Sequence, residues 1–236
     1  MSDGISLDDI LVQLTILTVP FGVFSIETGF VNLSLPNMLI ILTIIYFTIT
    51  VILTGDVRLS KPQLSVLGLL CITTITILIS LAIQQGSPRR LVTYIGYLLI
   101  TTILFVYIDS ISDVERVLRA AFLSAVAISV LTIVHSVSYP IGLPFGQAYI
   151  GQRTVVGVTV PFQRTIGLPG ISYGAFGMML MIATPYYFYQ GIKNKSKLTL
   201  FGVSLVLLAV LISQSRSTWV ATGLAVFVVV SGYSVR

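Results

Sequence analysis

Long apolar runs separated by short polar links make up most of the chain. Most runs approach the roughly 20 apolar residues that a helix needs to cross the hydrocarbon core of a membrane. Flanking Ser, Thr, Gly and aromatic residues complete the shorter runs. The pattern predicts an all-α fold, a polytopic transmembrane bundle that forms a single domain over residues 1–236. Its roughly eight spanning helices are expected at 10–24, 38–53, 64–83, 91–108, 117–134, 171–188, 198–212 and 218–230.

The only long interruption of this pattern lies between residues 136 and 170. It carries Arg153 and Arg164 and no acidic residue. Gly167 and Pro169 follow Arg164, and glycine and proline let the backbone turn tightly and approach a ligand closely. We interpret residues 136–170 as a long loop on the outer face of the membrane and as part of a cationic site for a phosphorylated lipid.

The composition makes a lipid environment necessary. Hydrophobic residues account for 56% of the chain and charged residues for 9%, whereas soluble domains contain roughly a quarter charged residues. The single cysteine, Cys71, lies in an apolar run, and one cysteine excludes a disulfide within the chain. The sequence has no nucleotide-binding loop, dinucleotide fingerprint or metal-ligand spacing. We therefore expect no metal, no other cofactor and no nucleic-acid partner.

The kind of cation differs between the two sides of the predicted bundle. With a cytoplasmic N-terminus the inner side carries more cations than the outer side, as expected for a protein of the cell (cytoplasmic) membrane. All the lysines are then inner, and the outer cations are all arginines: Arg89, Arg90, Arg153, Arg164 and Arg216. The planar fork of arginine matches phosphate oxygens bidentately. For Arg89 and Arg90 we favour the simpler interpretation that they reach lipid phosphates at helix ends.

Three arginines are the candidate diphosphate-binding residues. Arg216 lies in a very short link between two apolar runs, close to membrane depth, where a charge usually has a function. Arg164 lies beside glycines without an acid nearby, and Arg153 is a plausible helper in the same stretch. His135 is the only histidine. A lone helical histidine is more often a packing residue than a catalyst, and no acid lies close in sequence to orient His135 as a base.

Several stretches resemble the O-antigen ligase and Wzy-type O-antigen polymerase superfamily. The first is the opening of the chain, where one apolar run ends near Pro20 and the next run starts near Ser34-Leu-Pro. The second is the Arg164…Gly167…Pro169 stretch. The third is Ile212-Ser-Gln-Ser-Arg216-Ser-Thr-Trp219 at the start of the last apolar run. The last of these is similar to the family's Ser-Arg-small-residue signature. Two positions depart from the family pattern, since Ser217 replaces a common glycine and Pro169-Gly170 replaces a Pro-Asn pair.

The resemblance implies a membrane glycosyltransferase of polysaccharide biosynthesis at the cell surface. Such a protein transfers or polymerises glycan from a polyprenyl-diphosphate donor to a lipid or glycan acceptor, without a metal, while arginines hold the diphosphate. Family members have further spanning helices and a later loop with a catalytic histidine, whose position His135 does not match. The chain is accordingly expected to be an N-terminal portion, a part of a split reading frame or a degenerate member, and to lack the catalytic half.

Two other functions remain open on these residues. A flippase or transporter for lipid-linked polysaccharide would use the arginines to line a path for the headgroup. However, the apolar runs lack the midplane acid that a proton- or sodium-coupled transporter usually carries. The third function is that of a non-catalytic membrane subunit that pairs with a partner.

Overall fold

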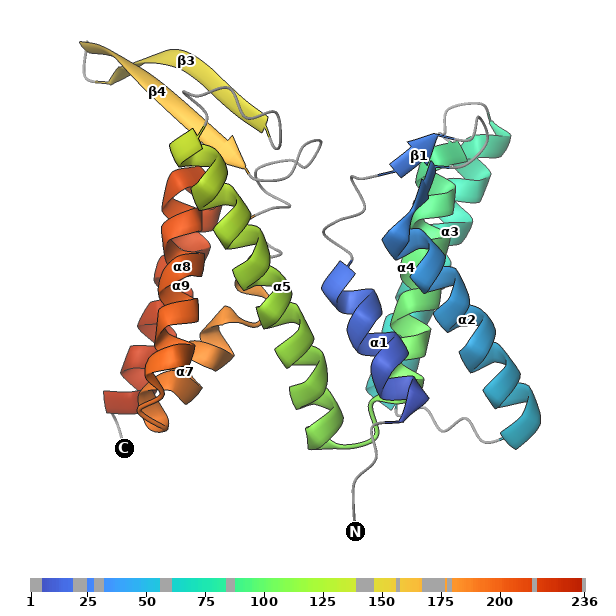
Figure 1. The fold of residues 1–236 in the computed structure, drawn as a ribbon. Helices are drawn as coiled ribbons and strands as arrows, with labels where there is room; N and C mark the ends of the chain where they lie inside the picture. Colours follow the sequence, from blue (N-terminus) through green and yellow to red (C-terminus); the bar gives the residue numbers. More distant parts are fainter. Residues whose placement is uncertain are drawn as a thin grey trace. The chain divides into compact units, whose positions relative to one another are not determined.

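The computed structural model describes residues 6–18, 25–27, 32–55, 61–83, 88–138, 147–155, 158–166, 177, 180–213 and 216–234. Most of these residues are helical (Figure 1). The helices are α1 (Leu7–Thr18), α2 (Leu35–Thr54), α3 (Lys61–Ala82), α4 (Pro88–Tyr107), α5 (Ile111–Ser138), α7 (Thr184–Lys193), α8 (Lys197–Ser213) and α9 (Arg216–Ser234). The strands are β1 (Ser25–Glu27), β2 (Asn32–Ser34), β3 (Gln147–Val155) and β4 (Val158–Ile166).

The predicted helical class is confirmed for most of the described chain. Each predicted apolar run overlaps one of these helices, and the sixth overlaps α7 at residues 184–188. Most of the helices extend a few residues beyond the predicted ends. The end of the first predicted helix, residues 19–24, lies outside the described residues. The strands, which the apolar pattern does not predict, form two antiparallel hairpins: β1 pairs with β2, and β3 pairs with β4.

The structure differs from the prediction in the middle of the chain. Within residues 136–170, predicted as a loop, α5 continues to Ser138 and β3 and β4 pair along their full lengths. The predicted helix 171–188 is also interrupted, because a turn at residues 182–183 separates α7 from the residues before it. Pro185 lies in the first turn of α7, where its missing N–H needs no partner and its fixed φ favours a new helix start.

Two described helical segments are long and apolar enough to cross a membrane, residues 63–80 of α3 and the whole of α5. Other apolar stretches, such as 38–54, 197–213 and 218–232, are shorter by this measure. Many large apolar side chains on α2, α3 and α9 are exposed, among them Ile72 and Phe227. Soluble monomers rarely expose apolar surface of this extent, so these faces belong against lipid or another protein, and the chain is a membrane protein.

The described residues form two compact units, and each is described by itself. Unit 1 combines residues up to Thr15 with Asn37–Arg116, and unit 2 combines Ile16–Pro36 with Val117–Arg236. The boundary passes through α1 and through α5.

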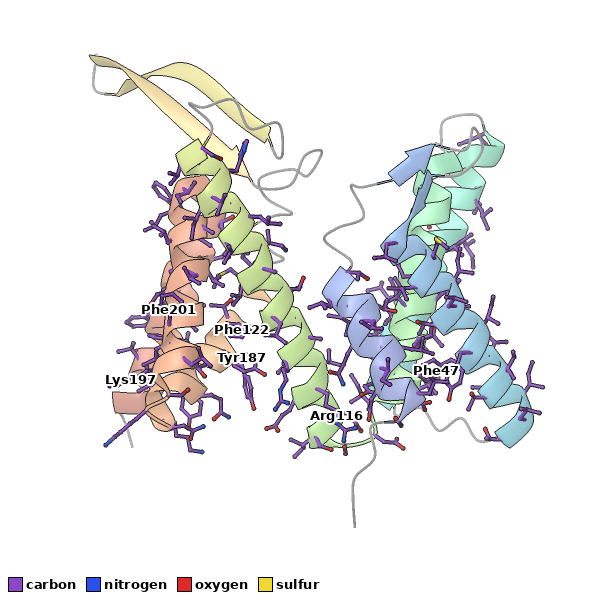
Figure 2. The ribbon with its side chains drawn as sticks, in the orientation of Figure 1. Phe47, Arg116, Phe122, Tyr187, Lys197 and Phe201 are labelled. Atoms are coloured by element: carbon purple, nitrogen blue, oxygen red, sulfur yellow. The ribbon has the colours of Figure 1, made fainter. Side chains whose placement is uncertain are left out.

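Polar side chains join the helices of unit 1. The hydroxyls of Thr15 in α1 and Thr43 in α2 lie 2.9 Å apart, and both residues are buried. The carboxylate of Asp9, only 6% exposed, accepts hydrogen bonds at 2.7 Å from the Tyr107 hydroxyl and from the Arg116 guanidinium. Figure 2 shows Arg116 near the start of α5. One carboxylate thus connects α1, α4 and α5.

The same contacts change the acidity of Asp9, which precedes the apolar part of α1. The hydrogen bond from Tyr107 and the bonds from Ser6 stabilise the carboxylate more than burial destabilises it. The Arg116 cation adds to this effect. Together they hold the pKa of Asp9 below its ordinary value.

Unit 2 is built on an apolar core. Its buried members come from α5, the residues before α7, and α8: Phe122, Ala125, Ile128, Leu180, Ala183, Val203, Val206, Ala209 and Val210. Tyr187 and Phe188 of α7 are partly buried and pack against them. The rings of Phe122 and Tyr187 stack with their centroids 4.3 Å apart (Figure 2). Buried hydroxyls such as those of Ser129 and Thr132 donate to carbonyls of their own helix, four residues earlier. Close packing therefore holds α5, α7 and α8 together.

Candidate anion-binding site

The β3–β4 hairpin places two of the predicted arginines on one face. Arg164 pairs with Tyr149, and Arg153 pairs with Val160. Directly paired residues share a face of a sheet, and residues two apart along a strand return to that face. Tyr149 and Arg153 are four residues apart, so both arginines belong to the same face at levels about 13 Å apart along the strands.

The two faces of the hairpin differ in composition. The face with the arginines also carries Tyr149, Gly151, Phe162 and Ile166. The opposite face is uncharged: Ala148, Ile150, Gln152, Thr154, Thr159, Pro161, Gln163 and Thr165. By this register, both charged residues of the hairpin belong to one face, together with aromatic and aliphatic residues.

The third arginine opens a helix at the same end of unit 2. Arg216 is the first residue of the 19-residue helix α9, where unpaired N–H groups and the helix dipole favour a negative charge. Figure 1 shows the hairpin beyond the end of α5, with the end of α8 and the start of α9 on that same side. β4 also packs against α8. Unit 2 thus brings the hairpin arginines and Arg216 to one end of its helices.

The start of α9 is fixed by close contacts. A Cβ built on Gly177 would lie 1.8 Å from the Thr218 hydroxyl oxygen, so only glycine permits this approach. The Trp219 indole N–H donates to the Val210 carbonyl in α8 at 2.9 Å. The last residue of α8, Ser213, is fully buried. These contacts hold the first turn of α9 in place, and with it the backbone of Arg216.

His135 lies one turn before the end of α5, on the side of unit 2 that carries the hairpin. Its side chain is only 2% exposed. The burial agrees with a packing role, which the sequence also favours, and a catalytic role for His135 stays a prediction.

An apolar groove of about 230 Å³ lies elsewhere, between α2 and α4 of unit 1. Its lining includes Phe47, Leu99 and Thr102, and it has no charged member. The Thr102 hydroxyl donates to the Leu98 carbonyl of its own helix at 2.7 Å. The groove therefore suits hydrocarbon and offers no group for an anion.

The charges of the chain are divided unevenly. From residue 117 to the end the sequence has no Asp or Glu, although it has eight Lys and Arg. Unit 2 contains this stretch and only one acid, Glu27. Most cations of unit 2 accordingly need counterions that the unit does not supply.

The arginines could be identified from the sequence, but the strand pairing and the helix contacts that position them could not. The pairing of Tyr149 with Arg164 and the close approach of Gly177 to Thr218 were not predicted. The hairpin had a signal, because β-branched residues flank a two-residue Val156-Gly157 connection, and a glycine there is typical of tight hairpins. The Gly177 contact had no such signal, since nothing in a sequence names the residue that a glycine meets.

Comparisons of the chain with protein-family models, curated proteins and solved structures find no match.

Proposed function

We propose that the chain is a membrane glycan transferase of the O-antigen ligase or polymerase type, which takes glycan from a polyprenyl-diphosphate donor at the outer face of the membrane. The observation that carries this proposal is the register that places Arg153 and Arg164 on one face of the hairpin. The position of Arg216 at the same end of unit 2 and the lack of acids after residue 116 support it.

The arginines have a specific role in this reaction. An acceptor hydroxyl oxygen forms the new bond to the anomeric carbon and gives its proton to water, while the bond from that carbon to the diphosphate breaks. Negative charge grows on the departing polyprenyl diphosphate. Guanidinium groups placed around it stabilise the transition state more than the bound donor, and so they serve both binding and catalysis.

The proposal includes a multi-pass topology of about eight spans with a cytoplasmic N-terminus. Lys193, Lys195 and Lys197 lie at or before the start of α8, and Arg216 follows its end. The 17 residues of α8 span about 25 Å, so lysines and arginines occupy opposite ends of this helix. That separation supports lysines on the inner side and the hairpin on the outer side.

Thiol labelling tests the orientation. In a Cys71→Ser background, which removes an exposed cysteine, we expect Arg153→Cys to react with a membrane-impermeant reagent added outside the cell. Labelling only after access to the cytoplasm would overturn the topology, whatever the function.

Binding of a polyprenyl-diphosphate glycan tests the function. Arg164→Lys and Arg216→Lys should each weaken binding about tenfold, because lysine cannot contact two phosphate oxygens at once. Arg89→Lys is the matched control, because the sequence assigns Arg89 to lipid phosphates, and it should bind like the parent chain. Unchanged binding in both test variants would contradict the proposal.

A transport assay distinguishes the flippase function from the transferase function. If proteoliposomes of the chain move the lipid-linked glycan across the bilayer and no glycan is transferred, the flippase function is favoured. The same arginine variants should then reduce transport.

A further inference from the structure

The turn between α7 and α8 holds three lysines in a fixed geometry. The Asn194 N–H donates to the Gln190 carbonyl at 2.9 Å, and the Ser196 N–H donates to the Gly191 carbonyl at 3.0 Å. The second bond is the long closing bond of a Schellman C-cap. Every second residue of this turn is a lysine, and all three are exposed: Lys193, Lys195 and Lys197.

Lys195 occupies the position that such a turn normally gives to glycine. Its φ is +51°, in the left-handed region, where a side chain costs free energy that glycine avoids. A residue kept in such a conformation points to a use for its side chain. The turn therefore places a cation where backbone stability alone would favour glycine.

Half-buried residues of α7 continue this polar surface. The Lys193 ammonium lies 5.9 Å from the centre of the Tyr189 ring. The Asn194 amide donates to Gln190 and the Gln190 amide donates to the Tyr186 hydroxyl, both at 3.1 Å. Tyrosines beside lysines are typical of the level of lipid headgroups.

Apolar surface begins directly after the last lysine. Leu198 is 83% exposed and Phe201 is 61% exposed. Figure 2 shows Lys197 and Phe201 on successive turns of α8. This order, from charge to exposed hydrocarbon within about one helical turn, matches the order of groups in a phospholipid.

We propose that the Lys193–Lys195–Lys197 turn, with Tyr186 and Tyr189, is a binding site for an anionic phospholipid. The lysines contact the headgroup phosphate, and the acyl chains lie along Leu198 and Phe201. The site is separate from the arginine site, because the length of α8 lies between them. The proposal therefore does not depend on the glycan-transferase function.

Charge supports an anionic partner. The nearest acid in sequence to this turn is Glu115, and none follows it. Each lysine close to an anionic membrane surface strengthens binding by about fivefold, and salt weakens the effect. The tight turn holds the lysines together before a lipid arrives, which lowers the entropic cost of binding.

Lipid retention in detergent tests the proposal by native mass spectrometry of the full chain. The chain should retain phosphatidylglycerol and not phosphatidylcholine, and retention should fall as salt rises. The triple variant K193Q/K195Q/K197Q should lose the bound phosphatidylglycerol, whereas K193R/K195R/K197R should keep it because the charge is unchanged. Equal retention by the glutamine variant, or loss in the arginine variant, would overturn the proposal. Displacement of the lipid by inorganic phosphate would show a site for free phosphate instead and would also overturn it.

A single substitution separates lipid binding from folding. Lys195→Gly should raise the thermal midpoint of unit 2 in detergent, because glycine adopts the positive φ without strain. The same variant should retain phosphatidylglycerol about fivefold less well. A variant that gains stability and keeps full lipid retention would show that Lys195 has no part in the site.

Discussion

The two units of this chain are held together by different interactions. In unit 1, some polar side chains cross from one helix to another, as between Thr15 and Thr43 or between Asp9 and Tyr107. Other hydroxyls of unit 1, such as those of Thr74 and Thr102, donate within their own helix. In unit 2, the buried hydroxyls of Ser129 and Thr132 return to their own helix, and apolar packing joins the helices. Trp219, Ser124 and Thr222 are exceptions. Trp219 and Ser124 donate to carbonyls in other helices, and Thr222 donates to the sulfur of Met181.

The two units also differ in the balance of their charges. Unit 1 contains five Lys and Arg and seven Asp and Glu, whereas unit 2 contains eight Lys and Arg and one Glu. The Asp9–Arg116 and Asp113–Arg116 ion pairs of unit 1 use some of its charges internally. Seven of the eight cations of unit 2 lie in the hairpin, at the start of α9, in the lysine turn and near the start of α5, while Arg236 lies outside the described residues.

This difference between the units distinguishes charged side chains that pair within the protein from charged side chains that can bind a ligand. A unit that neutralises its own charges gains contacts between helices but presents little net charge outside. Unit 2 obtains its cohesion from apolar packing, so its cations are available for phosphate groups. Both sites proposed for this chain, one for a diphosphate and one for an anionic lipid, accordingly lie in unit 2.

The largest predicted effect concerns the packing of unit 2. Gly177→Ala places a methyl group 1.8 Å from the Thr218 hydroxyl oxygen, and Thr218 is buried. Overpacking of this kind should destabilise the unit by about 3 kcal/mol. Trp219 is the only tryptophan and lies in the affected helix, so its fluorescence during thermal unfolding in detergent measures the loss.

The matched control for Gly177 is a glycine of unit 1. A Cβ on Gly68 in α3 would meet nothing within 4 Å, and alanine in mid-helix is favoured over glycine by up to about 1 kcal/mol. Gly68→Ala should therefore leave the protein as stable as before or slightly more stable. If both substitutions have the same effect, close packing is not what distinguishes unit 2.

The next effect concerns the polar contacts of unit 1. Asp9→Asn removes the charge that Tyr107 and Arg116 bond to. Loss of hydrogen bonds to a charged group should cost about 2 kcal/mol. Circular dichroism should show an earlier melting transition, while the Trp219 transition stays in place. Asp109→Asn, at an exposed carboxylate, is the control, and a shift of both transitions by Asp9→Asn would show that the units are not separately stabilised.

Much of the helical fold could be predicted from the sequence, because long apolar runs constrain the backbone to helices. The ranges expected at 38–53, 64–83 and 198–212 fall within α2, α3 and α8 apart from one residue. The turn at 182–183 was missed because its own residues, Ile182 and Ala183, are apolar and continue the apolar run from Met181. The hydropathy of a stretch indicates whether it is suited to an apolar environment, but it does not indicate where a helix ends.

The candidate site could be predicted only as a set of residue types. Arginines without acids marked Arg153, Arg164 and Arg216, but their arrangement depends on the pairing of β3 with β4. A shift of one residue in that register would place Arg153 and Arg164 on opposite faces. Likewise, Asp9 and Arg116 are far apart in sequence, and only the folded chain brings them within hydrogen-bonding distance.

Acid should weaken unit 1 before unit 2. Folding lowers the pKa of Asp9, so the folded state binds this proton less tightly than the unfolded state, whose carboxyl has a pKa of about 3.9. The stabilisation is complete above that pKa and is lost as the pH falls through it toward the lower folded value. Melting by circular dichroism at decreasing pH should show this loss in the parent chain. The loss should be absent in Asp9→Asn, and a parent-like pH dependence in that variant would assign it to another group.

The smallest predicted effect compares one hydroxyl from each unit. Thr15→Val removes the contact with Thr43 between α1 and α2, and hydrogen bonds between membrane helices contribute about 0.6 kcal/mol on average. Ser129→Ala in α5 removes a bond that stays within its own helix, so it should leave stability unchanged or raise it slightly. Steric trapping or denaturation by a harsh detergent resolves differences of this size. Equal losses from the two substitutions would mean that hydroxyls hold both units together in the same way, and the contrast between the units would then rest on charge alone.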